Sequence, residues 1–312
     1  MDGVLVIDKP AGPTSHDVVA RARRALGEKR IGHTGTLDPL ATGVLPLVIG
    51  RATRLASMLS ATRKSYDAAV RLGAATSTYD AAARFAGGTP PPDDPGIEIG
   101  QVEQVLGRFR GAFEQMPPPY SAKKVGGVAA YKLARQNKPT ALTAVTVTVH
   151  ELRLLGLDHG LLTLHVTASP GFYVRSLAHD LGQALGCGAH LEALRRTAAG
   201  SFGLDCAISL EALDGGFSAV ASKLIPLEEL VPDIPAIRLN DQGARKASHG
   251  NSLGPEDFAE PGMALVIEAG GEGAGAGAER PGRVRLLGPD GRLLGIAETA
   301  PGGLLRPQVV LV

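Results

Sequence analysis

A single carboxylate, Asp38, lies in a stretch of sequence suited to holding a side chain still. The stretch runs from Gly32 to Gly43 and contains three glycines and one proline. Glycine is permissive about backbone angles, and proline fixes its own and donates no hydrogen bond, so a shaped loop is predicted instead of a helix or a central strand. Because the residue before a proline is driven towards extended geometry, Asp38 is presented from a stiff backbone. A carboxylate held in this way can act as a nucleophile or as a base.

The elements beside this loop are predicted from apolar runs. Residues 44–49 form such a run directly after the loop, which predicts a buried strand that anchors the loop in a rigid scaffold. Upstream, Val4 to Asp8 predicts another strand, and a helix is expected with Ser15 as its N-cap and Asp17 in its first turn. Taken alone, an aspartate in a glycine-rich loop is more often a turn residue than a catalytic one. Other parts of the sequence must therefore decide whether Asp38 is a turn residue or a catalytic residue.

Length and composition limit the class of protein. The chain has 312 residues, of which 44% are hydrophobic, enough for a substantial core and for two domains. The sequence contains no apolar run of membrane-spanning length and no cationic leader at Met1, so we expect a soluble, cytoplasmic protein. Cys187 and Cys206 have no second cysteine or histidine at the spacing of metal ligands, so we expect two core residues without a disulfide or metal.

Charge is segregated along the chain although the net charge is only +1. Residues 1–66 contain ten Lys or Arg and five acids, and residues 117–150 contain five bases and no acid. Residues 205–312 contain nine bases and fifteen acids. We therefore expect a phosphate-neutralising surface around the Asp38 loop, with nucleic-acid binding that weakens in salt. The alternative is that these charges only form solvated faces.

The middle of the chain mixes strand-like and helical patterns. Alternation and short apolar runs predict strands, and apolar residues at helical spacing predict helices. The expected strands are 66–72, 145–149 and 161–166. The expected helices are 53–59, 98–109, 173–185 with a stop at Gly186, 191–197 with the pair Arg195 and Arg196, and short helices around Leu210 and Leu227.

A second unit is expected near the C-terminal end. Pro226, Pro232 and Pro235 mark the expected boundary. Beyond it, short strands are expected at 265–267, 283–287, 293–297 and 309–312, with a hairpin turn at 289–291. Residues 269–278 are almost entirely Gly, Ala and Glu and are expected to form a flexible loop. The pattern predicts a small β-rich domain.

Four motifs in order resemble one enzyme family. They are residues 7–17, the loop 32–43, Lys64 to Tyr66 and Gly171 to Leu177. Together they closely resemble the TruB-type tRNA pseudouridine synthases. The resemblance implies an α+β fold, a mixed and mainly antiparallel sheet flanked by helices. It further implies a catalytic domain at 1–235, a thumb-like insertion at about 116–138 that lies against the RNA, and a PUA-like RNA-binding domain at 236–312.

The resemblance also assigns roles to individual residues. Asp38 is implied as the catalytic aspartate acting on a uridine in the T loop of tRNA, at position 55. Arg175 is nominated as its ion-pair partner, a guanidinium that would lower the pKa of Asp38. Tyr66 matches the tyrosine that stacks on the flipped base and could help to shuttle a proton. Without the motifs, Arg175 would be a surface arginine and Tyr66 a half-buried core tyrosine.

Further residues are implied for substrate binding. His33 resembles the histidine that enters the T loop where the base has left, and its alternative is a turn histidine bonded to the backbone. Tyr173 is a second candidate for the pocket wall. The other candidates are Gly35 and Thr36 in the loop, Lys9 and Lys64 as phosphate-binding or motif-bracing cations, and Lys123 and Lys124 in the thumb-like insertion.

The sequence departs from the family at three places. Residues 169–172 read Ser-Pro-Gly-Phe where the family usually has Ser-Lys-Gly-Thr, so a basic contact beside Arg175 is lost. Ala83 replaces a usual turn glycine after the matching Thr76, Thr78 and Asp80, and Val145 stands where an arginine is common. We expect weaker RNA binding with the chemistry retained beside Arg175, one phosphate contact fewer at Val145, and a different turn geometry at Ala83.

Pseudouridine formation needs few groups. No redox step, phosphoryl transfer or outside atom is involved, so we expect no cofactor and no metal. Asp38 could attack the sugar C1′ or the base C6, or remove the C2′ proton, and the sequence does not choose. We expect a monomer whose partner is the T arm of tRNA. The alternatives are an RNA-binding chaperone without turnover, a synthase acting on another RNA, and a carboxylate hydrolase, which usually needs two carboxylates.

Overall fold

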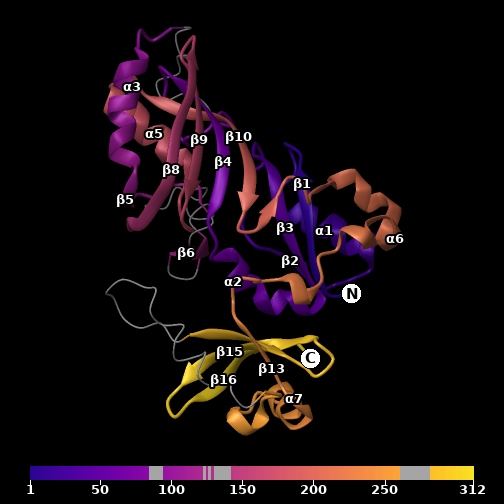
Figure 1. Cartoon of the computed structure of the whole chain (residues 1–312). Helices are drawn as coiled ribbons and strands as arrows, with labels where there is room; N and C mark the ends of the chain where they lie inside the picture. Colours follow the sequence, from indigo (N-terminus) through magenta and orange to yellow (C-terminus); the bar gives the residue numbers. More distant parts are fainter. Residues whose placement is uncertain (84–93, 122–123, 126–127, 130–141, 261–281) are drawn as a thin grey trace.

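The computed structural model describes residues 1–83, 94–121, 124–125, 128–129, 142–260 and 282–312. Within these residues a ten-stranded sheet dominates one part and a four-stranded sheet the other (Figure 1). The strands of the large sheet are β1 (Gly3–Lys9), β2 (Ile31–His33), β3 (Thr42–Ile49), β4 (Lys64–Leu72), β5 (Gly111–Gln115), β8 (Val145–Asp158), β9 (Leu161–Ala168), β10 (Ala189–Ala199), β11 (Phe202–Gly203) and β12 (Ile208–Ser209).

The large sheet is mixed and mainly antiparallel. Its order is β12-β1-β3-β10-β4-β9-β8-β5, with β2 paired to β3 and β11 paired to β10. Only the β1–β12 and β3–β10 pairs are parallel. The α+β prediction is therefore confirmed. The expected strands at 4–8, 44–49, 66–72, 145–149 and 161–166 are all present, and β8 continues well past its expected end.

Several of the helices cover one face of this sheet. The helical segments of the described chain are α1 (Ser15–Leu26), η1 (Gly50–Leu55), α2 (Ala56–Ser60), α3 (Ile99–Leu106), η2 (Gly107–Phe109), α5 (Val174–Leu185), η3 (Leu210–Gly215), α6 (Gly216–Val220), η4 (Ala221–Lys223), η5 (Leu227–Glu229), α7 (Asp241–Ser248) and η6 (Pro255–Asp257). Apolar side chains of α1, α3 and α5 share one buried cluster with alternate residues of β1 and β3, such as Leu5 and Leu45. This period-2 alternation leaves Val4 and Val44 on the opposite face.

The start of α1 differs by one residue from the prediction. Thr14 is the N-cap, because its hydroxyl accepts from the Asp17 N–H while the Asp17 carboxylate accepts from the Thr14 N–H. Ser15 is instead the first helical residue. Its hydroxyl accepts from the Leu37 N–H at 2.8 Å and donates to the Leu37 carbonyl at 3.0 Å, so it fixes the loop that carries Asp38.

The helix expected at 191–197 is wrong. These residues lie in β10, which runs between β3 and β4 in the middle of the large sheet. Register shifts between Leu191 and Ala193 and between Arg196 and Ala198 break the two-residue alternation. The buried Leu191 and Leu194 therefore fall three residues apart, which imitates the spacing of a helix. Pairing on both sides overrides that local pattern.

The four-stranded sheet has the order β13-β14-β15-β16. Its strands are β13 (Ala236–Arg238), β14 (Arg283–Leu287), β15 (Leu293–Ala300) and β16 (Leu304–Val310). The prediction of β14, β15 and the turn at 289–291 is confirmed, and β16 begins earlier than expected. β13 and α7 were not predicted from the sequence. The expected strand at 265–267 and the loop at 269–278 lie outside the described residues.

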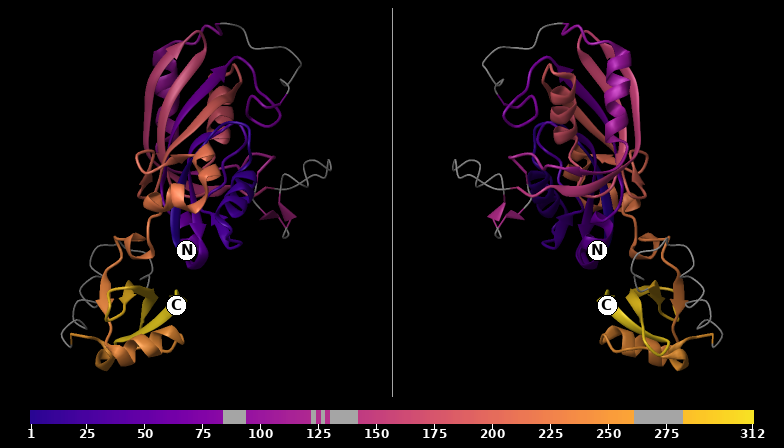
Figure 2. Two further views of the ribbon diagram at one scale, coloured as in Figure 1. Left: turned by 90° about the vertical axis from the view of Figure 1, so that its right-hand side faces the viewer. Right: turned by 90° about the vertical axis from the view of Figure 1, so that its left-hand side faces the viewer.

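The small sheet lies beyond one end of the large part, where β16 contacts η1, the helical turn that follows β3 (Figure 2). Val4 and Leu55 belong to the same buried cluster as Leu293 and Leu311. Arg51 donates to the Leu311 carbonyl at 2.9 Å, which adds a polar contact between the two parts. Within the described residues, no helix is long and apolar enough to cross a bilayer.

Candidate active site

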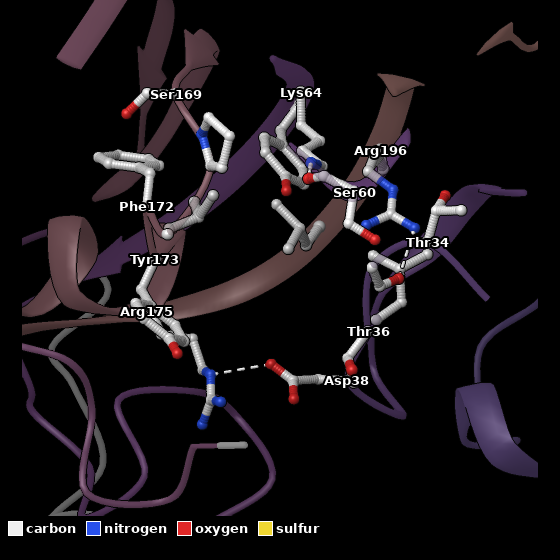
Figure 3. A pocket seen from close by; sticks show the side chains of 17 residues that line it. Thr34, Thr36, Asp38, Ser60, Lys64, Ser169, Phe172, Tyr173, Arg175 and Arg196 are labelled. Atoms are coloured by element: carbon white, nitrogen blue, oxygen red, sulfur yellow. Dashed lines mark hydrogen bonds and ion pairs between the residues drawn. The ribbon is translucent and has the colours of Figure 1, made fainter. Parts of the chain in front are cut away.

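A pocket of about 270 Å³ opens beside the Asp38 loop (Figure 3). Its walls come from the loop, the start of β4, the middle of β10 and the segment that leads into α5. The lining residues are Thr34, Gly35, Thr36, Leu37, Asp38, Ser60, Lys64, Tyr66, Ser169, Pro170, Gly171, Phe172, Tyr173, Val174, Arg175, Leu194 and Arg196. Segments far apart in the sequence therefore meet around one carboxylate.

Asp38 and Arg175 form the ion pair that the motifs imply. The Arg175 Nε lies 2.9 Å from the Asp38 Oδ2, and Figure 3 shows the two side chains pointing towards each other across the pocket. The Arg175 side chain is only 7% exposed, whereas that of Asp38 is 37% exposed and faces the opening. The carboxylate is thus held by a buried cation and remains accessible to a ligand.

The loop holds Asp38 through contacts on its backbone. The buried Lys9 ammonium donates to the carbonyls of Ala41 at 2.7 Å and Pro39 at 3.4 Å. The Gly12 N–H donates to the Pro39 carbonyl at 2.8 Å, and the Ala41 N–H donates to the Asp38 carbonyl at 3.0 Å. Residues on both sides of Asp38 are therefore fixed, as the composition of the loop predicts.

Arg175 is fixed at the start of α5 by three oxygen atoms besides Asp38. It donates to the carbonyls of Thr78 at 3.2 Å and Tyr120 at 2.9 Å, and its Nη1 lies 3.5 Å from the Asp80 Oδ2. The Asp80 side chain is almost fully buried. Arg175 is therefore shared between two carboxylates, of which only Asp38 faces the pocket.

The pKa of Asp38 is higher than that of an ordinary aspartate. Burial raises it, Arg175 lowers it, Asp80 raises it and Lys9 lowers it, in decreasing order of effect. Arg175 lowers this pKa, as expected. The effect of burial among protein atoms is larger, although the carboxylate reaches the opening of the pocket. The ion pair therefore limits a rise in pKa caused by burial.

Tyr66 lies in the pocket and contacts a buried arginine. Its phenol lies beside the Arg196 guanidinium, which donates to the carbonyls of Gly35 at 3.0 Å and Val44 at 2.6 Å. Arg196 thereby links Tyr66 to the loop that carries Asp38.

Comparison with known proteins identifies the family. The model of the TruB family pseudouridylate synthase N-terminal domain matches residues 23–174, and that of the tRNA pseudouridylate synthase B C-terminal domain matches residues 175–231. A tRNA pseudouridine synthase B of Solibacter usitatus is 45% identical over 86% of this chain and 92% of its own. The chain belongs to the TruB family.

Other relatives agree with this assignment to the TruB family. A tRNA pseudouridine synthase B of Burkholderia mallei is 39% identical over 100% of this chain and 97% of its own. Among solved structures, a Cbf5-Nop10-Gar1 complex contains a chain with a TM-score of 0.73 and 26% identity, covering 99% of this chain and 85% of that one. An H/ACA RNP bound to a substrate RNA containing 2′-deoxyuridine gives a TM-score of 0.71 at 24% identity, with 99% and 85% coverage, and shows a shared fold.

Two lysines predicted from the TruB resemblance have their ammonium groups bonded to backbone carbonyls. The Lys9 ammonium is enclosed by backbone carbonyls, and the Lys64 ammonium donates to the carbonyls of Ser60 and Thr62. Burial lowers the pKa of each lysine to about 8. In this geometry both lysines brace the backbone, which is the second of the two roles expected for them.

The remaining predicted residues differ in their position. Tyr173, Gly35 and Thr36 line the pocket, and burial raises the pKa of Tyr173. His33, at the end of β2, is not among the lining residues, and its Nδ1 accepts from the Gly35 N–H at 3.3 Å, the backbone contact of the alternative interpretation. Lys123 lies outside the described residues, and for Lys124 only the backbone strand β6 (Lys124–Val125) is described.

Asp80 and Arg196 were not predicted from the sequence as residues of the site. Asp80 stands in the matched Thr-x-Thr-x-Asp segment, and that match was the available signal. Arg196 was predicted on a helix at 191–197 and was given no role there. A buried arginine in a central strand could have been expected only once β10 was recognised.

Proposed function

We propose that this chain converts a uridine in the T loop of tRNA, at position 55, into pseudouridine. The observation that carries the proposal is the Asp38–Arg175 ion pair at the open side of the pocket. A pocket of about 270 Å³ suits one nucleobase and lies near the small end of ligand pockets. Membership of the TruB family and the names of the relatives support the same reaction.

The reaction requires an ionised carboxylate and an extruded base. The target uridine leaves its stack and enters the pocket, where Tyr66 and Tyr173 supply aromatic walls. The N1–C1′ bond breaks, the base turns over, and a C5–C1′ bond forms. The C5 proton is lost and N1 gains one, so the reaction is an isomerisation without an outside atom. Asp38 acts as the nucleophile or the base, and Arg175 holds it in place.

We propose which segments of the chain bind RNA from their charge and their position in the sequence. The excess of basic residues in 1–66 and 117–150 would neutralise tRNA phosphates around the pocket. The thumb-like segment at about 116–138 and a PUA-like domain at 236–312 would extend the contact along the T arm. A monomer acting in the cytoplasm, where tRNA is found, completes the proposal.

Release of tritium tests the reaction. A tRNA transcript with tritium at uridine C5 should release it to water with the wild type. Asp38→Asn, which removes the ionisable oxygen and keeps the shape, should lower release by at least about 10³-fold with tRNA affinity retained. Asp158→Asn, at a carboxylate 89% exposed, is the matched control and should behave as wild type.

Each rival function has its own result in this assay. Binding without tritium release in the wild type would indicate an RNA chaperone. Free uracil among the products would indicate a hydrolase, and faster release from a ribosomal RNA fragment than from tRNA would indicate another RNA target. Equal release by Asp38→Asn and wild type would remove Asp38 from the mechanism.

A further inference from the structure

Tyr79 has a backbone conformation that side chains disfavour. Its φ is +65°, in the left-handed region that costs a residue with a Cβ about 1 kcal/mol or more. Within the described residues only His159 and Val231 share a positive φ without being glycine. Tyr79 lies in the turn between Thr76 and Asp80, next to the pocket arginine. The free-energy cost of this conformation must be offset by a favourable contact of Tyr79.

That contact is a ring stack with α5. The Tyr79 and His179 rings lie 3.8 Å apart between centroids and only 8° from parallel. His179 follows Arg175 by four residues in α5, so the two side chains lie on one helix face, one turn apart. The same helix face therefore holds the turn twice, through Arg175 and through His179.

Tyr79 stands between the two groups that the turn offers to Arg175. The Thr78 carbonyl accepts from Arg175 at 3.2 Å, and the Asp80 carboxylate lies 3.5 Å from it. The turn is also tied to β10, because the Leu191 N–H donates to the Tyr79 carbonyl at 2.9 Å. That bond fixes the turn along the strand, and the ring stack fixes it against the helix. A change in the stack would move both of the groups that the turn offers to Arg175.

A buried polar atom belongs to the same contact. The His179 Nδ1 is buried and has no partner among the described residues. An unpaired buried polar atom costs about 1–3 kcal/mol, as a lost hydrogen bond does. Two unfavourable features thus meet in one contact beside the arginine that pairs with Asp38. Such local costs are common where a site is held in a defined geometry.

We infer that Tyr79 and His179 form a clamp that positions Arg175 against Asp38. The inference rests on the proposed roles of Asp38 and Arg175 and extends them to two residues that do not line the pocket. Both are positioning residues, since they act through the turn and through Arg175. The clamp sets the distance and direction of the guanidinium while the substrate side of the pocket stays open.

The variant Tyr79→Gly distinguishes a positioning role of the Tyr79 ring from a role in packing alone. Glycine accepts a positive φ without strain, so the turn keeps its conformation while the stack is lost. We expect kcat to fall about 10- to 100-fold, because small displacements of a catalytic group have effects of this size. The KM for tRNA should stay within about twofold. Tyr79→Phe, which keeps the ring, should restore kcat to within about twofold of wild type.

Two further variants complete the test. His179→Ala removes the other ring with the turn sequence intact, so it carries the test if Tyr79→Gly does not fold. His159→Gly relaxes a positive φ in the β8–β9 turn and is the matched control with unchanged kcat. In an Arg175→Met background, Tyr79→Gly should have no further effect on kcat, because a double-mutant cycle detects action through Arg175.

The outcomes distinguish the clamp from the proposed function. A folded Tyr79→Gly or His179→Ala with wild-type kcat would overturn the clamp and leave the reaction in place. An equal fall in kcat on Tyr79→Gly in the wild-type and Arg175→Met backgrounds would also overturn the clamp. A wild type that forms no pseudouridine in any tRNA would instead remove the proposed function.

Discussion

Asp38 is a carboxylate subject to two opposing electrostatic effects. Burial favours its protonated form and raises its pKa, and the Arg175 guanidinium at 2.9 Å favours the ionised form. The balance leaves the pKa above the ordinary value of an aspartate. The reaction needs the ionised form, so its rate should fall as the pH drops through this raised pKa.

Arg175→Met should move the acid limb of the pH–rate profile to higher pH. The variant removes the largest effect that lowers the pKa of Asp38, so the pKa rises further and the carboxylate protonates at a higher pH. Single-turnover rates between about pH 5 and 9 measure the shift. The maximum rate should also fall, because the carboxylate loses the group that orients it.

An exposed arginine provides the control for this shift. Arg108 lies in η2, and Arg108→Met should leave the pH profile unchanged. An acid limb at the same pH in Arg175→Met and wild type would show that another group titrates in that limb.

The sequence predicted the central residues of the site better than their surroundings. Asp38, Tyr66 and Arg175 were found because their motifs are short and local. For Lys9 and Lys64 the sequence left a phosphate-binding and a bracing role open, because the contact of Lys9 with the Ala41 carbonyl depends on how the chain returns to the loop. For the same reason the net effect of burial on the pKa of Asp38 was missed.

The elements were predicted well where one pattern dominates. β3 is a plain apolar run, and α5 has apolar residues at helical spacing with Gly186 in the left-handed conformation at its end. β10 failed because its bulges shift the apolar residues out of alternation. β13 was missed because it has three residues and follows a proline-rich segment.

Packing of α5 on β10 depends on one helical glycine. A Cβ added at Gly182 would lie 2.1 Å from the backbone nitrogen of Ala189, at the start of β10. Gly182→Ala should therefore lower the free energy of unfolding by about 3 kcal/mol, since the backbone of two elements must move apart. Urea unfolding of the purified variant measures the loss.

A second helical glycine tests whether crowding is the cause. Gly100 lies in α3, and a Cβ there would meet nothing within 4 Å. Gly100→Ala should be neutral or stabilise the protein by up to about 1 kcal/mol, because alanine loses less backbone freedom in a helix. A similar loss in both variants would contradict the packing argument.

On the scale of the whole molecule, the two sheets share a core. Leu293 of the small sheet and Leu311, which follows β16, belong to one buried cluster with Val4 and Leu55 of the large part. Shared apolar burial couples the unfolding of the two parts. We therefore expect a single cooperative transition in calorimetry, although the sequence alone suggests two separate domains.

Leu293→Ala should destabilise the molecule as one unit. Leu293 is 3% exposed, and truncating such a residue costs about 2–5 kcal/mol. The single transition should move to lower temperature and remain single. Leu155→Ala, at a leucine that is 52% exposed, should change stability by no more than about 0.5 kcal/mol. Two separate transitions in the wild type would show that the shared cluster does not couple the sheets.

The position of β10 has a consequence for synthesis on the ribosome. β3 and β4 follow each other in the sequence, yet β10, with residues 189–199, lies between them. A nascent chain that has emerged only as far as residue 150 therefore lacks the strand that joins its two halves. Such non-local pairing slows folding and exposes unpaired strand edges in the meantime. Chaperones that bind extended segments should accordingly engage this chain before residue 199 has left the exit tunnel.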